Sequence, residues 1–219
     1  SIKKRDFVCL RVNTLKSKVG EISKRLSFKG VENDVSPIIS NCLYISNKIK
    51  VSNLDDYRKG LFEIQDFGSQ LIVKLLNPRP YSLVVDFCCG AGGKVLASSA
   101  LMKNTGLIYA VDVSQKRIDE LNKRAKRAGV TNLCPLVVSS LEDSKIEKHS
   151  KRASFVLVDV PCTGSVQADA GVVIYLHIVR HIESQWRCAS GSGGYRGDGA
   201  LVVVLRVVRS GLRDKRMLW

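Results

Sequence analysis

The segment CCGAGGK, residues 88–94, is the first place in this sequence where the backbone could hold a small ligand. Its glycines at 90, 92 and 93 have no Cβ, so the chain can approach a bound molecule closely. It follows the apolar run SLVVDF at 82–87, which is typical of a buried strand. A turn between the carboxyl end of a strand and the amino end of a helix is where open parallel sheets bind cofactors.

Asp112 is the carboxylate whose spacing fits this turn. It lies nineteen residues past Gly93, near the spacing of about 20 at which an acidic residue accepts hydrogen bonds from ribose hydroxyls. The turn does not match a Walker-type phosphate loop, because Cys88 and Val95 replace its glycine and its serine or threonine. It does not match the GxGxxG motif of a dinucleotide site either, because a third glycine in register is missing. S-adenosylmethionine needs the ribose carboxylate but no diphosphate cradle, so the pattern favours it; a turn without a ligand is the alternative.

Cys162, in the segment DVPCTG at 159–164, could act as a nucleophile, and Asp159 stands beside it at the end of the same expected strand. Carbon 5 of cytosine is too weak a nucleophile to take a methyl group directly, so a thiolate must first add to carbon 6. A free thiol has a pKa of about 8.5, so such a cysteine needs surroundings that favour the anion. Taken alone, the segment favours a small buried cysteine at a strand end.

The elements that would position these residues alternate between strand and helix from Gly60 onward, which predicts a parallel sheet with covering helices. Strands are expected at 82–87, 107–113, 133–138 and 154–160. Helices are expected at 93–102 and between Ser114, a candidate cap, and Gly129. The second helix has an apolar stripe formed by Ile118, Leu121, Ala125 and Ala128.

Residues 1–59 are expected to form a separate small α+β unit. The pattern predicts a strand at 7–12, a helix with Val19, Ile22 and Leu26 at helical spacing, and a short strand at 43–45. Residues 1–60 contain thirteen Lys and Arg against six Asp and Glu. This excess predicts a surface that faces phosphates, with a solvated lysine face as the alternative.

The composition points to polyanionic partners and reduced thiols. The formal net charge is +15 and the pI is about 9.7, which favours nucleic acid. Seven cysteines with no CxxC pair and no zinc spacing predict an intracellular protein without a metal, its compartment unknown. No apolar run approaches a membrane span, and SIKKRDF at 1–7 lacks the core of a signal peptide. The sequence begins with Ser1, so an upstream segment could precede it. We expect no membrane partner and, by default, a monomer.

Four segments in collinear order resemble the RsmB/Sun family of S-adenosylmethionine-dependent RNA (cytosine-5)-methyltransferases. They are GLFEIQDFGSQLIVKLLNP (60–78), VVDFCCGAGGK (84–94), LIYAVDVSQKRIDELNKRAKRAGVTN (107–132) and VLVDVPCTG (156–164). LRVNTLK at 10–16 resembles the start of that family's amino-terminal RNA-binding region. The resemblance covers residues from about 7 to 164. It implies an α/β fold, with a Rossmann-like methyltransferase sheet at 60–164 and a small amino-terminal α+β RNA-binding unit at 1–59.

The resemblance also implies roles for single residues. The family's cofactor loop corresponds to Cys88, Cys89, Gly90, Ala91, Gly92, Gly93 and Lys94. Asp112 matches the residue that holds the ribose, Asp159 an aspartate beside both cofactor and target base, and Cys162 the cysteine of the Pro-Cys motif. An acidic residue often found after the third strand is not in place, since Ser139 and Ser140 stand there.

The basic helix after Ser114 supplies candidate RNA contacts, although on this fold such a helix usually just covers the sheet. The candidates are Lys116, Arg117, Lys123, Arg124 and Arg127.

After Gly164 the sequence departs from the family. The family's nucleophile lies in a later Thr-Cys pair, while the Pro-Cys cysteine assists product release; no Thr-Cys pair follows Cys162 here. Eighteen of the nineteen lysines precede Thr163. Both changes predict that residues 165–219 are a divergent tail, from a frame change, a retained intron or a mis-predicted exon. The sheet would then be incomplete unless the valine runs at 171–175 and 200–205 form strands.

The leading expectation is transfer of a methyl group from S-adenosylmethionine to carbon 5 of a cytosine in rRNA or tRNA, with Cys162 and Asp159 as catalytic residues. The alternative is a catalytically incomplete protein that binds RNA, S-adenosylmethionine or both. A third interpretation makes Cys162 itself the attacking nucleophile.

Overall fold

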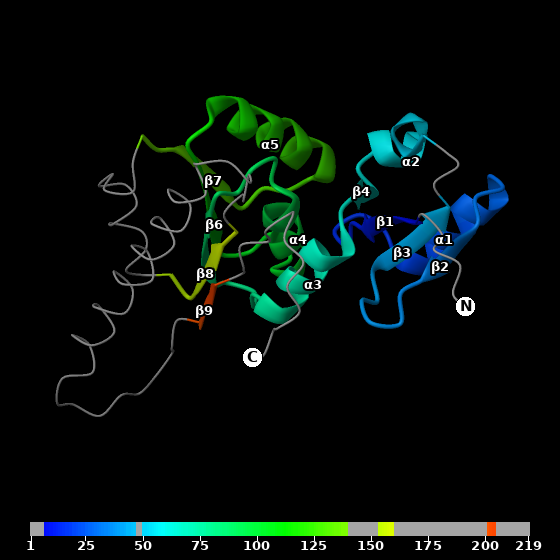
Figure 1. The fold of residues 1–219 in the computed structure, drawn as a ribbon, viewed down its shortest axis with the longest axis horizontal. Helices are drawn as coiled ribbons and strands as arrows, with labels where there is room; N and C mark the ends of the chain where they lie inside the picture. The colour runs from blue at the N-terminus through cyan, green and yellow to red at the C-terminus, as the bar shows by residue number, and fades with distance from the viewer. Residues whose placement is uncertain (1–6, 47–49, 140–152, 160–200, 205–219) are drawn as a thin grey trace, which may run out of the picture.

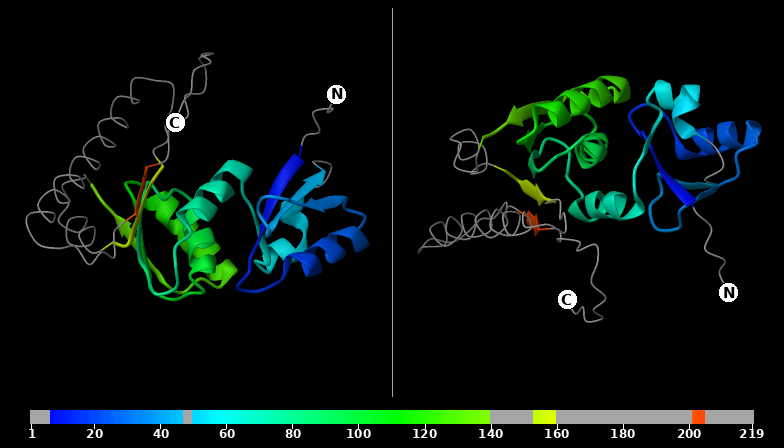
Figure 2. Two further views of the ribbon diagram at one scale, coloured as in Figure 1. Left: turned by 90° about the horizontal axis from the view of Figure 1, so that it is seen from below. Right: turned by 45° about the horizontal axis from the view of Figure 1, so that its top comes forward.

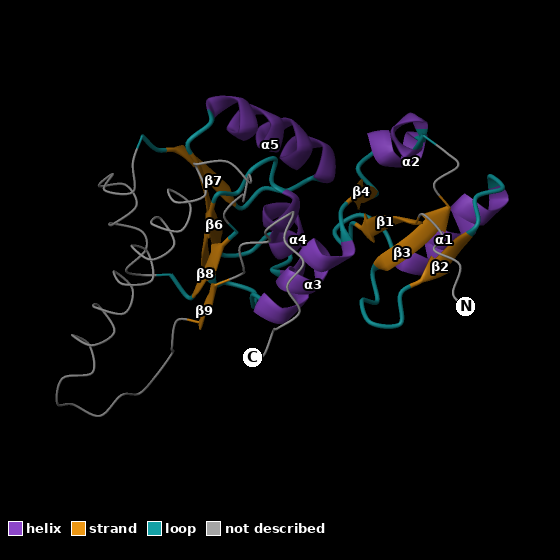
Figure 3. Ribbon diagram, in the orientation of Figure 1, coloured by secondary structure: helices purple, strands orange, loops and turns teal. Residues whose placement is uncertain are grey.

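The computed structural model describes residues 7–46, 50–139, 153–159 and 201–204. They form two units, each built on its own sheet (Figures 1 and 3). Cys162 and the valine run at 171–175 lie outside the described residues. No helix in the described ranges is both long enough and apolar enough to cross a bilayer.

The amino-terminal unit is a four-stranded antiparallel sheet in the order β2-β3-β1-β4. Its elements are β1 (Phe7–Val12), α1 (Val19–Phe28), β2 (Asn33–Val35), β3 (Cys42–Ser46), the 3₁₀ turn η1 (Val51–Asn53), α2 (Asp55–Arg58) and β4 (Phe62–Ile64). The predicted strand at 7–12 and the predicted helix are confirmed. The sheet continues past residue 59, the expected limit of this unit, because β4 pairs with β1.

Alternation along β1 explains how this unit is packed. Leu10 and Val12 point to one face, where they join Ile22 and Leu26 of α1 in a buried cluster. Arg11 lies between them and therefore points to the other face. That face looks toward the second unit, and Arg11 is only 3% exposed there.

The second unit is a five-stranded parallel sheet in the order β7-β6-β5-β8-β9. Its elements are α3 (Phe67–Leu76), β5 (Leu83–Phe87), α4 (Gly93–Leu101), β6 (Leu107–Asp112), α5 (Gln115–Ala128), β7 (Leu133–Val137), β8 (Phe155–Val158) and β9 (Leu201–Val204). Figure 2 shows α3, α4 and α5 on the side of the sheet that faces the amino-terminal unit. The four predicted strands and two predicted helices are confirmed, with ends that differ by one or two residues.

The sheet continues beyond β8. The valine run at 200–205 supplies β9, whose backbone pairs in parallel with β8 from Phe155↔Leu201 to Val158↔Val204. This run therefore behaves as one of the two alternatives predicted for it, a strand.

Helix α5 forms as its sequence predicts, except at its start. The expected apolar stripe is buried, and Gly129 ends the helix with a φ of +73°. Ser114 occupies the cap position, but among the described residues its side chain makes no capping hydrogen bond. Its backbone N–H instead donates to Asp112 Oδ1 at 2.9 Å. The carboxylate thus holds the beginning of the helix.

The two units meet along a seam formed by Arg11, Asn13, Glu63, Arg124 and Arg127. Asn13 donates through Nδ2 to the carbonyl of Gly60 at 2.9 Å and to that of Ala128 at 2.8 Å. Glu63 of β4 forms ion pairs with Arg124 and Arg127 of α5, with nitrogen–oxygen distances of 2.9 and 2.7 Å. These contacts join residues that are far apart in sequence, so the seam is a tertiary interface.

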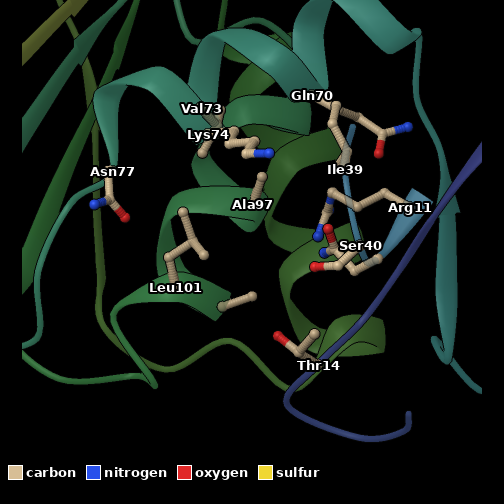
Figure 4. Close-up of a pocket in the computed structure, with 12 residues that line it drawn as sticks. Arg11, Thr14, Ile39, Ser40, Gln70, Val73, Lys74, Asn77, Ala97 and Leu101 are labelled. Atoms are coloured by element: carbon tan, nitrogen blue, oxygen red, sulfur yellow. The ribbon is translucent and has the colours of Figure 1, made fainter. Parts of the chain in front are cut away.

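A cavity of about 210 Å³ opens beside the seam, between the two units (Figure 4). Arg11, Thr14, Ile39, Ser40 and Asn41 line it from the first unit, and Gln70, Val73, Lys74, Asn77, Ala97, Ala100 and Leu101 from the second. The glycine turn at 88–94 contributes nothing to its wall. It is therefore distinct from the cofactor cavity described below.

Candidate cofactor and active site

The turn between β5 and α4 has the strained backbone of a site built for close approach. Cys88 has a φ of +64°, which is unusual for a residue with a side chain. Gly90 and Gly92 follow with φ of +55° and +82°. The N–H of Cys89 donates to the carbonyl of Val111 at 2.9 Å, which fixes the turn to the neighbouring strand.

Gly92 is required for packing as well as for conformation. A Cβ at this position would lie 2.1 Å from Leu121 Cδ1 on α5. At Gly90, by contrast, the nearest atom to such a Cβ is 4.0 Å away. Gly92 therefore lets α5 pack against the turn, while Gly90 leaves open space above it.

Asp112 supports the turn from the end of β6. Its side chain is buried, and its Oδ2 accepts a hydrogen bond from the N–H of Gly90 at 2.9 Å. Arg117 Nη1 lies 3.6 Å from the same oxygen. The predicted neighbourhood of Asp112 and the glycine turn is therefore present.

One cavity of about 390 Å³ gathers most of the predicted cofactor-binding residues. It is lined by Gln65, Ser69, Cys88, Cys89, Gly90, Ala91, Gly93, Lys94, Arg117 and Asp159. Gly92 packs behind this wall, and Asp112 reaches the wall through Gly90 and Arg117. Cys162 cannot be placed, because it lies outside the described residues. Within those residues, no group of three or more His, Cys, Asp or Glu side chains is arranged to hold a metal ion.

Lys94 connects the turn to the far strand of the site. Its ammonium forms an ion pair with Asp159 Oδ2, just past the end of β8. The two side chains are 17% and 32% exposed. The pair therefore faces the cavity with part of its surface and places a cation next to the carboxylate that precedes the Pro-Cys motif.

Asp86 belongs to the site although the sequence analysis did not select it. It is the last residue but one of β5 and is 2% exposed, and its Oδ1 has no hydrogen-bond partner in the described part of the chain. Burial raises its pKa to about 8; Lys94 opposes this shift, whereas Asp159 and Asp112 add to it. The signal was a single aspartate inside the apolar run VVDF, where a charge is costly without a purpose.

Gln65 is the second residue that the sequence analysis missed. Its Oε1 accepts a hydrogen bond from Arg11 Nε at 2.6 Å, which fixes the orientation of the amide. Gln65 lines the cavity, and its buried Nε2 finds no partner among the described residues. A buried amide donor without a partner is costly, so it is suited to an acceptor on a ligand. A lone glutamine after a short strand carries no pattern that would have revealed this.

The two thiols of the turn are poor nucleophiles. Burial, and then the neighbouring carboxylates, raise the pKa of Cys88 to about 11. The same causes raise the pKa of Cys89. Both thiols are therefore neutral near pH 7, and their contribution here is shape.

The candidate RNA-binding residues of α5 divide into two groups. Arg124 and Arg127 face the seam, where both pair with the buried carboxylate of Glu63, and Arg117 pairs with Asp112. Lys116 and Lys123 are exposed to solvent. RNA contact stays a prediction for all five, but the structure already gives the three arginines partners within the chain.

Comparisons with known proteins agree with this architecture. A family model described as 16S rRNA methyltransferase RsmB/F matches residues 73–173. The human protein named 28S rRNA (cytosine(4447)-C(5))-methyltransferase is 31% identical over 160 residues, which are 72% of this chain and 19% of that protein. Ribosomal RNA small subunit methyltransferase F of Vibrio parahaemolyticus is 32% identical over 162 residues, or 71% of this chain and 33% of the relative.

A solved structure of a methyltransferase homologue from Pyrococcus horikoshii is also similar. Its TM-score is 0.66 at 32% identity, over 74% of this chain and 52% of that one. The chain thus spans well under two thirds of the length of the relatives that it matches. Nevertheless, the family match at 73–173 includes the glycine turn, strands β5 to β8 and helix α5, and on this evidence the chain belongs to the RsmB/F family of methyltransferases.

Proposed function

We propose that this chain binds S-adenosylmethionine and transfers its methyl group to carbon 5 of a cytosine in RNA. The observation that carries the proposal is the convergence of the glycine turn, Lys94 and Asp159 on one cavity, with Asp112 holding the turn from behind. That arrangement suits a nucleoside that carries an amino acid better than it suits a diphosphate, because no phosphate loop is present at the turn.

The unpartnered polar atoms of the site fit the amino-acid end of this cofactor. Among the described residues, Gln65 Nε2 is a donor without an acceptor, and Asp86 Oδ1 is an acceptor without a donor. An α-carboxylate and an α-ammonium group would satisfy one each. Asp112 would accept hydrogen bonds from the ribose hydroxyls, as its spacing predicted.

The proposed reaction has three stages: addition of a thiolate to the base, transfer of the methyl group and release of the thiolate. A cysteine thiolate adds to carbon 6 of the cytosine, so that carbon 5 becomes nucleophilic. S-adenosylmethionine, when bound, supplies a methyl group on a positively charged sulfur. After transfer, carbon 5 loses its proton, and the thiolate leaves carbon 6 to restore the ring. Asp159, held by Lys94, would hydrogen-bond the base, and Cys162 would supply a thiolate in the addition or in the release step.

Ribosomal RNA is the substrate class that the relatives' names favour, because both quoted relatives are named rRNA methyltransferases. Transfer RNA stays the alternative. The target base would have to leave its stack to reach the cavity. The exposed lysines of α5, Lys116 and Lys123, would contact phosphates and not bases.

The test is a transfer assay with the full chain, methyl-labelled S-adenosylmethionine and either rRNA or tRNA, followed by nucleoside analysis for 5-methylcytosine. Label in 5-methylcytosine that is lost in Asp159→Asn supports the proposal. Binding of the cofactor without any transfer to either RNA would contradict it. Lys103→Gln, a change in the turn after α4, serves as the control for surface charge.

A second candidate function rests on the missing Thr-Cys pair. Without that cysteine the chain would bind RNA, the cofactor or both, and would not turn over. Cys162→Ala separates the two candidates. If Cys162 attacks the base, the variant loses all transfer; if another thiol attacks and Cys162 only releases product, a covalent RNA adduct accumulates. A chain that binds but transfers nothing, in either form, is the non-catalytic module.

A further inference from the structure

Arg124 of α5 makes contacts in two directions. Its Nη2 pairs with Glu63 Oε2 of the amino-terminal unit at 2.9 Å, and its Nε lies 3.3 Å from the same oxygen. Its Nη1 donates to the backbone carbonyl of Ala91 at 2.8 Å. One rigid guanidinium group therefore joins a carboxylate of the first unit to the middle of the cofactor turn.

The second arginine at Glu63 lacks this link. Arg127 donates through Nη2 to both carboxylate oxygens of Glu63, at 2.7 and 2.8 Å, and its guanidinium lies 4.2 Å from the centre of the Tyr57 ring. Within the described ranges, the partners of its side chain all belong to the first unit. Arg124 and Arg127 thus share a partner and a helix, but of these two arginines Arg124 is the one that contacts the turn.

The carboxylate that holds Arg124 is itself firmly placed. The Glu63 side chain is 1% exposed, and it sits opposite Arg11 in the β1–β4 register. Burial lowers the pKa of Arg11 to about 10, against the attraction of Glu63. With three guanidinium groups around one buried carboxylate, the position of Arg124 is fixed from the side of the first unit.

The turn needs such support because its own backbone is strained. Cys88 and Gly92 have positive φ. Within the turn, the N–H of Gly92 donates to the carbonyl of Cys89 at 3.0 Å. Ala91 stands between Gly90, which lines the cavity, and Gly92, which packs against α5. A donor on its carbonyl fixes the orientation of the peptide that joins Ala91 to Gly92.

We propose that Arg124 is a positioning residue that holds the cofactor turn in its binding conformation, and that the amino-terminal unit supports the turn through Glu63. Cofactor affinity then depends on the docking of the amino-terminal unit, although Glu63 itself does not line the cavity. The inference toward the cofactor rests on the proposed function; the inference about the turn does not.

The experiment compares Arg124→Gln with Arg127→Gln in the full chain. Both remove one ion pair to Glu63, but only the first removes the donor to Ala91. Calorimetric titration with S-adenosylmethionine is expected to give a Kd about tenfold higher for Arg124→Gln, and within about twofold of the original for Arg127→Gln. Hydrogen exchange without ligand is expected to be about tenfold faster in the peptide that covers 88–94 for Arg124→Gln alone.

Arg124→Lys is the second variant, for the case in which the glutamine substitution prevents folding. It keeps a positive charge for Glu63 but cannot make both contacts with one ammonium group. The Kd and the exchange rate of the turn should change with it in the same direction. A melting temperature measured for each variant shows whether a general loss of stability accompanies the change.

The outcomes separate the two claims. Equal effects of Arg124→Gln and Arg127→Gln on the turn, or no effect of either, would overturn the positioning role. If the original chain does not bind S-adenosylmethionine, the proposed function fails; selective exchange in Arg124→Gln would still uphold the positioning of the turn. Binding by the original chain with a selective loss in Arg124→Gln supports both.

Discussion

Two buried carboxylates in this chain have opposite surroundings. Glu63, in the seam, is 1% exposed and accepts hydrogen bonds from two arginines. Asp86, beside the cofactor cavity, is 2% exposed and has one oxygen without a partner among the described residues. Removing one partner of a buried ion pair is costly, whereas a buried carboxyl group with an oxygen left unpaired costs stability and is suited to a ligand. Among the described residues, the seam carboxylate thus has its partners in the free chain, and the carboxyl group beside the cavity does not.

The largest expected effect is the loss of the seam carboxylate. Glu63→Gln leaves buried guanidinium groups without a counter-charge and should lower the free energy of unfolding by roughly 3–5 kcal/mol. Urea denaturation measures it. Asp55→Asn removes an exposed pair with Arg58, 3.7 Å apart, and should cost less than about 0.5 kcal/mol. Similar costs for the two variants would mean that the seam is not a stabilising contact.

The next effect compares Gly60 of the seam with Gly92 of the cofactor turn. A Cβ at Gly60 would lie 2.1 Å from the backbone oxygen of Arg127, whereas one at Gly92 would meet the end of a leucine side chain. Backbone cannot move aside as a side chain can, so Gly60→Ala should cost roughly 3 kcal/mol or more and Gly92→Ala about 2 kcal/mol.

Gly30→Ala is the control for this pair, because Gly30 has a φ of +73° and no atom within 4 Å of an added Cβ. It should cost only the backbone term of about 1 kcal/mol. Thermal or urea unfolding of the three variants gives the order. If Gly92→Ala were the most costly, the packing of α5 on the cofactor turn, and not the seam, would be the tighter contact.

Asp86 predicts a dependence of stability on pH. Below the unfolded pKa of 3.8 both states hold the proton; between there and about 8 only the folded state does, so stability falls as pH rises through this window. The contribution of this one group is at most about 1.4 kcal/mol for each pH unit. Urea unfolding at pH 5 and pH 7 should show a smaller decline in Asp86→Asn than in the original chain. Identical declines would show that Asp86 titrates normally.

The smallest expected effect concerns Lys116 and Lys123, which belong neither to the seam nor to the cavity wall. Lys116→Gln with Lys123→Gln should change the free energy of unfolding by less than about 0.5 kcal/mol, since both side chains are exposed. If both contact phosphates, the slope of the logarithm of RNA affinity against the logarithm of salt concentration should shrink by roughly 0.7–0.9 per lysine. An unchanged slope would remove them from the RNA-binding surface.

Much of the fold could be predicted because apolar runs and helical stripes report burial directly. The strands at 82–87 and 107–113 and the stripe of α5 are of this kind. The strands β2 and β4 have three residues each, too short for alternation to be visible. Their place in the sheet depends on pairing with distant strands.

The site could be predicted where the spacing of residues along the sequence follows from the order of parallel strands. The glycine turn and Asp112 follow adjacent parallel strands, so their ends meet at one edge of the sheet. The roles of Arg124, Arg127 and Gln65 were not predictable in the same way. Each depends on a partner more than fifty residues away, Glu63 or Arg11, and a basic helix has the same sequence whether its cations face solvent or a buried carboxylate.

The short connection between the two units affects how far the first unit lies from the cavity. Only Gln65 and Asp66 separate β4, the last strand of the first sheet, from α3, the first helix of the second unit, and Asp66 caps that helix by accepting from Ser69 N at 3.1 Å. The seam contacts of Asn13 and Glu63 with α5 hold the two units together beside this short connection. The first unit therefore lies at a set distance from the cavity. If a polynucleotide binds to it, the nucleotide that reaches the cavity would stand at one set number of steps along the strand.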